Sequence, residues 1–385
     1  MANIFVEKLS LANPYACGHV LKRGVPSRLP MDTAWWRRPS TLPLVILSMA
    51  LLIIVAGGAI RINDAGESCP DWPKCFGTYG FDVSPDEQEQ YWDENPDEID
   101  SRGEFHRYTV FEIFLEWVHR LLVAIIAVPI VANIFIAKKK KDIYGQSNYH
   151  SSIFIATLLL IQATAGATTV YFDNADWTVA LHLSLACIFS VSIIWQFLLM
   201  KVKEGARWGF LSTSKHFIDN NKKRFDAIAG SVLFLLILGA WVSSTAGGQY
   251  NQSCSVGFPN GWPKCNGSVV PSLEEPGVLI QMIHRIGALV IGLILIASIL
   301  KVKKDNQDSP ESEVYVKFLF YTGGLWVLNL MIGASYLIFA KSGDFPEWIS
   351  LLHLVGGVSC FFMSLVCTFM IRLSLLSNNI KLVEE

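Results

Sequence analysis

Apolar residues of this chain are gathered into blocks that are long enough to cross a lipid bilayer. A helix needs roughly 20 residues to span a hydrocarbon layer ~30 Å thick. We count eight such blocks, which cover residues 42–60, 111–137, 152–171, 178–200, 227–246, 278–300, 316–340 and 348–372. Only 17% of the 385 residues are charged, whereas a soluble domain carries about 25%. The sequence therefore predicts an all-α membrane protein with eight transmembrane helices.

Basic residues of the connecting segments fall on one side of this predicted membrane domain. They lie in the N-terminal tail and after the second, fourth and sixth blocks, at Arg37, Arg38, Lys138–Lys141, Lys201, Lys203, Arg207, Lys215, Lys222–Arg224, Lys301, Lys303 and Lys304. The first connection on the other side instead carries ten acidic residues and one arginine between Asp82 and Glu104. By the positive-inside rule, both termini are expected in the cytoplasm and the odd-numbered connections outside. No transit peptide is evident, which favours the inner (plasma) membrane of a bacterium, and the net charge of -2 argues against a nucleic-acid partner.

Two pairs of cysteines lie in connections that this orientation places outside. Cys69 and Cys75 follow the first block, and Cys254 and Cys265 follow the fifth. The outer face of a bacterial membrane permits disulfides, so we expect the bridges Cys69–Cys75 and Cys254–Cys265 or a redox-active pair. Zinc is the competing interpretation, but these cysteines have no nearby histidine and lack the Cys-x2-Cys spacing.

The two halves of the chain resemble each other in several short motifs. Residues 57–66 match 239–248, Trp72–Cys75 recurs as Trp262–Cys265, and Gln162–Ala167 matches Asn329–Ala334. Each half holds an even number of blocks, so the repeats are expected to be parallel, related by an axis along the membrane normal. The predicted architecture is two tandem, pseudo-symmetric four-helix bundles. Its parts are a cytoplasmic tail at 1–41, bundles at 42–200 and 227–372, a cytoplasmic linker at 201–226 and a second cytoplasmic tail at 373–385.

Four histidines fall inside the even-numbered blocks, near their outer ends, at about the same depth: His119, His182, His284 and His353. A polar side chain in hydrocarbon is costly and usually functional. One such histidine is most simply a hydrogen-bonded packing residue, but four at one depth, two per repeat, are harder to explain in that way. Imidazole is a common axial ligand of haem iron, and facing helices of a bundle can supply both ligands. We therefore expect two haem sites near the outer face, one between His119 and His182 and one between His284 and His353.

Three arginines lie near these expected sites. Arg120 and Arg285 each follow a candidate ligand, and Arg61 lies at the outer end of the first block. Arginine suits bidentate contact with carboxylates such as haem propionates. Interfacial anchoring is an equally good explanation for all three.

Function is expected where the repeat symmetry breaks. Glu116 lies one helical turn before His119, on the same helix face, whereas its repeat mate is Gln281. The fold therefore does not need a charge at this position, and a carboxylate beside a haem could transfer protons or stabilise a cation. A salt bridge to a nearby arginine is the structural alternative.

These residues resemble those of the haem A synthase family, over positions 42–372. The motifs that carry the resemblance are Glu116-x-x-His119-Arg120, His284-Arg285, His182, His353 and the cysteines beside Trp-Pro-Lys-Cys. The resemblance implies that His284 and His353 ligate a cofactor haem b and that His119 and His182 bracket the substrate haem O. It also implies a catalytic Glu116 and a redox or haem-transfer role for Cys69 and Cys75.

The reaction implied by this resemblance oxidises the C8 methyl of haem O in two steps, and loss of water from a gem-diol gives the formyl group of haem A. The implied partners are haem O synthase, terminal oxidase assembly, and a quinone or another electron carrier. Two features depart from the family pattern: the acidic insertion at 81–104 and the wide Cys254–Cys265 spacing.

Two other classes of protein remain open at this point. A di-haem b-type membrane cytochrome that exchanges electrons with quinone would need the four histidines but not Glu116. A transporter or assembly factor would use the histidines for protons or metal, and it would purify without haem.

Overall fold

The computed structural model describes residues 34, 37–243, 253–305, 310–342 and 344–384, with side chains placed as far as Ser377. Eight of its helices are long and apolar enough to cross a membrane. These are α2 (Thr41–Ile62), α4 (Val110–Lys139), α6 (Gln146–Tyr171), α7 (Asp176–Lys203), α8 (Lys215–Ser243), α9 (Pro276–Asp305), α10 (Pro310–Phe339) and α11 (Glu347–Glu384). The predicted all-α membrane protein with eight transmembrane helices is confirmed.

Shorter helices occupy the connections. They are α3 (Pro85–Glu94), α5 (Lys141–Tyr144) and the 3-10 turns η3 (Pro96–Glu98) and η4 (Gly209–Ser212). No β-strand occurs within the described ranges of the chain.

Two helices extend well beyond the predicted apolar blocks. α8 begins at Lys215 rather than at 227, and α11 continues to Glu384 rather than ending at 372. Much of the predicted linker and of the C-terminal tail is thus helical, because backbone hydrogen bonding does not stop where the hydrocarbon layer stops. Residues 244–246, the end of the predicted fifth block, lie outside the described part of the chain.

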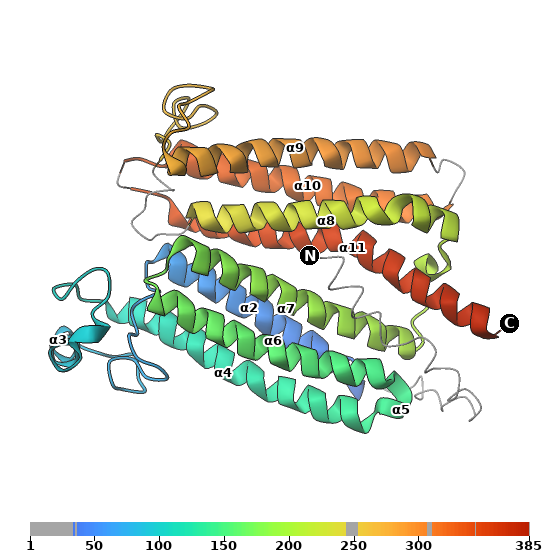
Figure 1. Ribbon diagram of the computed structural model, residues 1–385, viewed down its shortest axis with the longest axis horizontal. Helices are drawn as coiled ribbons and strands as arrows, with labels where there is room; N and C mark the ends of the chain where they lie inside the picture. Colours follow the sequence, from blue (N-terminus) through green and yellow to red (C-terminus); the bar gives the residue numbers. More distant parts are fainter. Residues whose placement is uncertain (1–33, 35–36, 244–252, 306–309, 343, 385) are drawn as a thin grey trace.

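The long helices lie side by side in two groups (Figure 1). In one group α2, α4, α6 and α7 contact their neighbours, and in the other α8, α9, α10 and α11 do so. The groups meet where α7 contacts α8 and where α11 contacts α2 and α7. The predicted pseudo-symmetry between the two groups stays a prediction.

Each group has its own buried apolar cluster. Ile46, Ile126, Ile155 and Ile193 join the four helices of the first group. In the second group the cluster includes Val232, Leu295, Leu319 and Phe361. Lipid tails are as apolar as these side chains, so close packing rather than exclusion of water stabilises the contacts.

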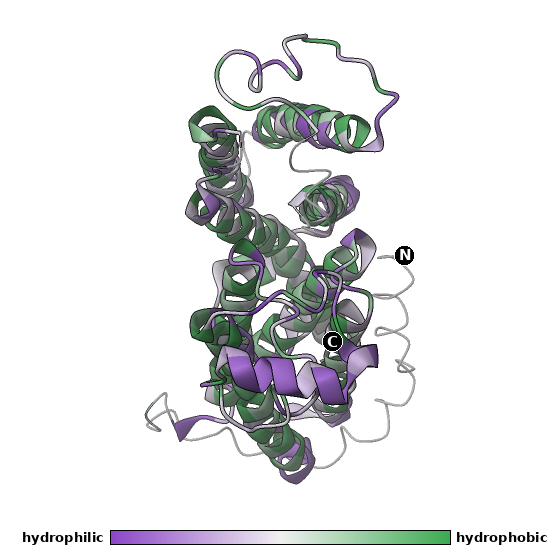
Figure 2. Ribbon diagram, turned by 90° about the vertical axis from the view of Figure 1, so that its left-hand side faces the viewer, coloured by the Kyte–Doolittle hydropathy of each residue, from purple (hydrophilic) through white to green (hydrophobic). Residues whose placement is uncertain are grey.

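The two cysteine-bearing loops lie at the same end of the helices, which we call the disulfide end (Figure 1). Here residues 63–109 form a small structured unit around α3, which is strongly hydrophilic against the apolar bundle (Figure 2). Its core includes Phe76, whose ring packs edge-on against that of Trp92 with centroids 5.5 Å apart. α3 begins with a capping box, in which Ser84 and Glu87 satisfy each other's backbone N–H groups.

Candidate functional site

The four histidines singled out from the sequence lie in α4, α7, α9 and α11, each near the disulfide end of its helix. Their side chains project into the bundles rather than towards lipid, since each ring lies against a neighbouring helix. No cluster of three or more metal-ligating side chains occurs in the described ranges of the chain.

His284 and His353 face each other across a cavity in the second group of helices. Their ring centroids are 6.4 Å apart and the ring planes are 80° apart. Two imidazoles that bind one metal from opposite sides, with bonds of about 2 Å, have ring centres roughly 6 Å apart. The cavity has a volume of about 240 Å³ and is lined by both rings and by Trp262 from the α8–α9 connection. The pair thus has a separation that fits a shared haem iron.

A backbone carbonyl approaches one of these rings. His353 Nδ1 lies 3.0 Å from the carbonyl oxygen of Asn329 in α10. A carbonyl can only accept, so in this contact Nδ1 donates, which favours the tautomer with the lone pair on Nε2. This is the second contact that metal-ligating histidines usually make, and it orients the ring.

His119 of α4 and His182 of α7 are the counterparts of this pair in the first group, and each ring lies against a glycine of a neighbouring helix. The Gln162 amide nitrogen lies 3.2 Å from Nδ1 of His182 and donates to the His182 carbonyl oxygen at 3.0 Å. Gln162 is the repeat mate of Asn329, so both halves support this ring from the same helix position. His119 Nδ1 is buried and has no hydrogen-bond partner among the described residues. A free imidazole nitrogen inside a bundle fits a site that a ligand completes.

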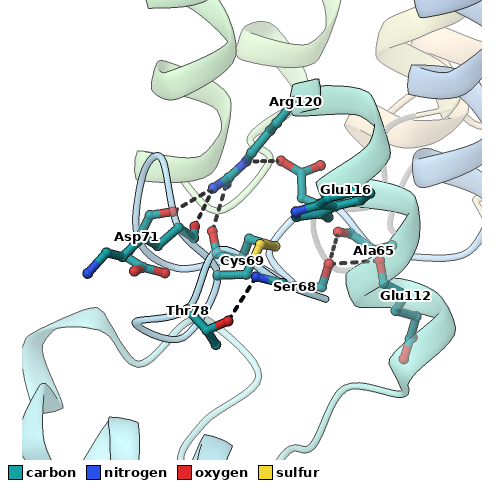
Figure 3. The surroundings of a disulfide bond; sticks show 12 residues. Ala65, Ser68, Cys69, Asp71, Thr78, Glu112, Glu116 and Arg120 are labelled. Carbon is teal, nitrogen blue, oxygen red and sulfur yellow. Dashed lines mark hydrogen bonds and ion pairs between the residues drawn. A yellow bond between two sulfur atoms is a disulfide. The ribbon is translucent and has the colours of Figure 1, made fainter. Parts of the chain in front are cut away.

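Glu116 is buried one turn before His119 and is paired with Arg120 (Figure 3). Arg120 Nε donates to Glu116 Oε1 at 2.8 Å. The other end of the guanidinium donates to backbone carbonyls of the disulfide loop: Cys69 at 2.7 Å, Lys74 at 3.1 Å, and Asp71. One cation therefore both neutralises the buried carboxylate and holds the loop.

The second half repeats this arrangement without the charge. Arg285 donates to the Lys264 carbonyl at 2.9 Å and to Gln281 Oε1 at 3.2 Å. Glu116 therefore makes the salt bridge that was its structural alternative to a catalytic role, and both arginines contact loop carbonyls. Propionate contact by these arginines stays a prediction.

Arg61 lies one helical turn after Gly57, the α2 residue that faces His119. It forms an ion pair of 3.7 Å with Glu347 at the start of α11, so it bridges the two groups of helices. Glu347 also accepts a hydrogen bond of 3.3 Å from Tyr336, which lines the His284–His353 cavity. The predicted propionate role of Arg61 stays a prediction as well.

Both expected disulfides are present. Cys69 is bonded to Cys75, and Cys254 is bonded to Cys265. This pairing excludes the zinc interpretation for these cysteines. Three further cysteines, at 187, 360 and 367, are buried and free.

Glycines facing the histidine rings are the functional candidates that the sequence did not reveal. Gly57, Gly166, Gly239 and Gly333 each lie against one of the four imidazoles. All four lie within the repeated motifs, which was the available signal, but only the fold shows which side chain faces them.

The arrangement can be compared with known proteins. A sequence profile of the family COX15-CtaA, described as cytochrome oxidase assembly protein, matches residues 40–365, which include all four histidines and Glu116. The chain belongs to this family. Several known proteins share about a quarter of their residues with this chain. One is named "Heme A synthase" from Shewanella oneidensis and is 25% identical over 348 residues, which are 84% of this chain and 93% of the relative.

Other relatives carry the same name. "Heme A synthase" from Caulobacter vibrioides is 24% identical over 339 residues, covering 78% of this chain and 90% of the relative. "Heme A synthase" from Shouchella clausii is 23% identical over 261 residues, covering 66% and 72%. The COX15-CtaA chain described here thus aligns over most of its length with proteins named for one activity.

Proposed function

We propose that this protein is a haem A synthase, which oxidises the C8 methyl of haem O to the formyl group of haem A in two steps. The observation that carries the proposal is the His284–His353 pair, 6.4 Å apart across a cavity, in a chain whose curated relatives are named heme A synthase. The name of the relatives supplies the reaction, and the paired imidazoles supply a place for its cofactor.

The two histidine pairs take different roles in this proposal. His284 and His353 hold the resident haem b, and His119 and His182 bracket haem O as substrate. When bound, the resident haem supplies one-electron transfer. The chain would hold that haem through the imidazoles of His284 and His353, and the Asn329 carbonyl orients the His353 ring through its Nδ1 atom.

Glu116 is the residue proposed to handle protons beside the substrate. Its carboxylate lies on the same helix face as His119, one turn away, and is buried. Arg120 balances its charge and fixes its orientation through the 2.8 Å contact. A positioned carboxylate can accept the proton that leaves the substrate as the methyl group is oxidised, a contribution typically worth 10²–10⁴-fold in rate.

The membrane context follows from the charges. Lys138–Lys141 and the other basic clusters lie at the end of the bundle opposite the disulfide end. By the positive-inside rule, we expect both termini on the cytoplasmic side of a plasma membrane and the histidine pairs near its outer face. The proposed partners are haem O synthase as the source of substrate, terminal oxidase assembly as the destination, and a quinone or another redox carrier.

Extraction of haem from cells that express the protein together with a haem O synthase tests the proposal. Mass analysis is expected to find haem A in these cells and none in cells that lack the protein. Protohaem alone, with a low-spin spectrum, would instead support the di-haem b-type cytochrome. Purification without any haem would overturn both.

Glu116→Gln tests the carboxylate and copies the second half of the chain. The variant is expected to retain haem and to lose at least about 100-fold in conversion rate. Glu116→Asp is the matched control, because it keeps a carboxylate at the same position, and it is expected to retain more conversion than Glu116→Gln. Unimpaired conversion by Glu116→Gln would remove Glu116 from the mechanism.

A further inference from the structure

Each of the four candidate ligand rings lies against a glycine of the preceding transmembrane helix. Gly57 of α2 faces His119, Gly166 of α6 faces His182, Gly239 of α8 faces His284, and Gly333 of α10 faces His353. A Cβ atom at these glycines would lie 3.4, 3.1, 3.0 and 2.7 Å, respectively, from the ring Cε1 atom. Carbon atoms in favourable contact are about 3.5–4.0 Å apart. Any side chain at Gly239 or Gly333 would therefore push the ring.

We propose that these glycines are positioning residues, which set the depth and direction of the ligand imidazoles. The inference rests on the proposed haem ligation and adds residues that neither touch the iron nor carry a polar group. These glycines act by having no side chain, because a side chain at these positions would displace a ring.

The contact recurs in the internal repeat, which argues against chance packing. Gly57 and Gly239 occupy matching positions of the repeated motifs, as do Gly166 and Gly333. The same helix-to-helix contact therefore appears twice in each half, always with an imidazole on the other side.

Clearance differs between the halves. The Gly333–His353 contact is the tightest, and the His353 ring is also bonded to the Asn329 carbonyl one turn away in the same helix. It cannot rotate away from a methyl group without breaking that bond. The Gly57–His119 contact is an ordinary van der Waals distance. The tight pair thus belongs to the half proposed for the resident cofactor, and the looser one to the half proposed for an exchanging substrate.

A change from glycine to alanine also acts on the helix itself, whatever the residue faces. Other glycines in the same helices separate this effect from displacement of a ring, because they face no ring. Gly324 in α10 and Gly230 in α8 have no atom within 4 Å of an added Cβ. They are matched controls for Gly333 and Gly239.

The experiment compares Gly333→Ala, Gly239→Ala, Gly324→Ala and Gly230→Ala in the full chain, purified in detergent. The measurements are the haem-to-protein ratio, the electron paramagnetic resonance signature of bis-histidine low-spin haem, and helical content by circular dichroism. Gly333→Ala is expected to weaken haem binding roughly 10- to 100-fold, as loss of an orienting contact does, with a shifted low-spin signature. Gly239→Ala is expected to show a smaller loss of the same kind.

Both controls are expected to keep the wild-type haem ratio and signature. Helical content is expected to be preserved in all four variants, because alanine is a better helix former than glycine. Should Gly333→Ala fail to accumulate as folded protein, the comparison of Gly239→Ala with Gly230→Ala decides the matter alone.

The inference is overturned if Gly333→Ala and Gly239→Ala bind haem with the wild-type ratio and signature, or if the controls lose as much haem as they do. Wild-type protein without haem would show instead that the proposed function is wrong. That result differs from haem-loaded protein in which the glycine substitutions change nothing.

Discussion

Arg120 shows how one side chain can serve two parts of the molecule. Its guanidinium donates from one edge to the buried carboxylate of Glu116 and from the other to carbonyls of the loop that contains Cys69. Arg285 has the same position in the other half but faces the neutral Gln281. The two arginines therefore make a natural pair for comparison.

Arg120→Gln is expected to destabilise the protein more than Arg285→Gln does. Loss of Arg120 leaves the carboxylate of Glu116 buried without a partner, which costs about 3–5 kcal/mol. Loss of Arg285 leaves only neutral groups unpaired and costs about 1–3 kcal/mol. Thermal unfolding followed by circular dichroism measures both. Equal losses would mean that the Glu116 charge is not buried as described.

A pH-dependent contribution to stability is expected from Glu67 in the first loop. Burial raises the pKa of its carboxyl above the ordinary value, and the 2.7 Å hydrogen bond from Asn174 only partly opposes this. A raised pKa means that the folded state takes up a proton before the unfolded state does as pH falls. Protonation of Glu67 should therefore stabilise the wild-type protein as pH falls through the raised pKa towards the ordinary value of 4.5, and this stability should be lost as pH rises again.

Glu67→Gln removes this dependence and serves as the reference for it. Its unfolding temperature is expected to exceed that of the wild type at neutral pH, because a buried charge is removed, and the difference is expected to shrink as pH falls. Melting curves recorded across the pH range check the sign; a difference that grows as pH falls would contradict it.

Sequence alone singled out the candidate side chains of the site but not their contacts. His353 stood out because imidazole is rare in hydrocarbon, whereas Gly333 carries no side chain that could stand out. The partners of Arg120 are backbone carbonyls some 50 residues earlier, and any residue type supplies a carbonyl. Such contacts follow from the folded path of the loop and leave no trace in residue identity.

Among the elements, α3 and its surroundings behave as a separate small unit at the disulfide end. Trp92 is 3% exposed and packs edge-on against Phe76, while Arg107 lies 5.1 Å from the Trp92 ring. Gln88 ties this unit together by bonding the Tyr108 backbone twice, at 2.9 Å each. None of these residues belongs to a histidine pair.

Trp92→Ala is therefore expected to loosen this unit without affecting haem. Truncation of a buried tryptophan costs about 3–5 kcal/mol of local stability. Limited proteolysis should cut residues 81–104 faster in the variant, while the haem-to-protein ratio stays at the wild-type value. Gln90→Ala, at an exposed position of the same helix, is the control and should be cleaved at the wild-type rate. Loss of haem in Trp92→Ala would show that the unit supports the membrane site.

Helix positions were predictable where hydropathy determines them and unpredictable where it does not. The α6–α7 turn follows directly from the polar residues Asp173 and Asn174 between two apolar blocks. The first turns of α8, from Lys215 to Arg224, are charged and lie beyond any apolar block, so nothing in the hydropathy pattern predicts them. Their helical state comes from backbone propagation and from contacts such as the burial of Phe217.

At the scale of the whole molecule, one of the contacts that join the two groups of helices is a seam between α2 and α11. Gly58 permits the approach: a Cβ there would lie 2.6 Å from Leu351 and 2.9 Å from Leu354. The Arg61–Glu347 ion pair lies one turn further along the same seam. This seam joins the helix that faces His119 to the helix that carries His353.

Gly58→Phe is expected to weaken the association of the two groups. An overpacked contact costs about 1–3 kcal/mol. Protease cleavage within 204–214, between α7 and α8, should leave the wild-type halves associated during purification and should release them more readily in the variant. Gly324→Phe, which points into open space in α10, is the control. Halves of Gly58→Phe that stay together as firmly as those of the wild type would place the main contact elsewhere, at α7 and α8.

The double duty of Arg120 also limits how this corner of the protein can change. Replacing Glu116 alone leaves a cation that the loop carbonyls still satisfy, so the protein tolerates it structurally. Replacing both Glu116 and Arg120 by neutral residues restores the charge balance but leaves the loop carbonyls without their hydrogen-bond donor. Substitutions at the arginine therefore have no simple second-site remedy, whereas substitutions at the carboxylate need none.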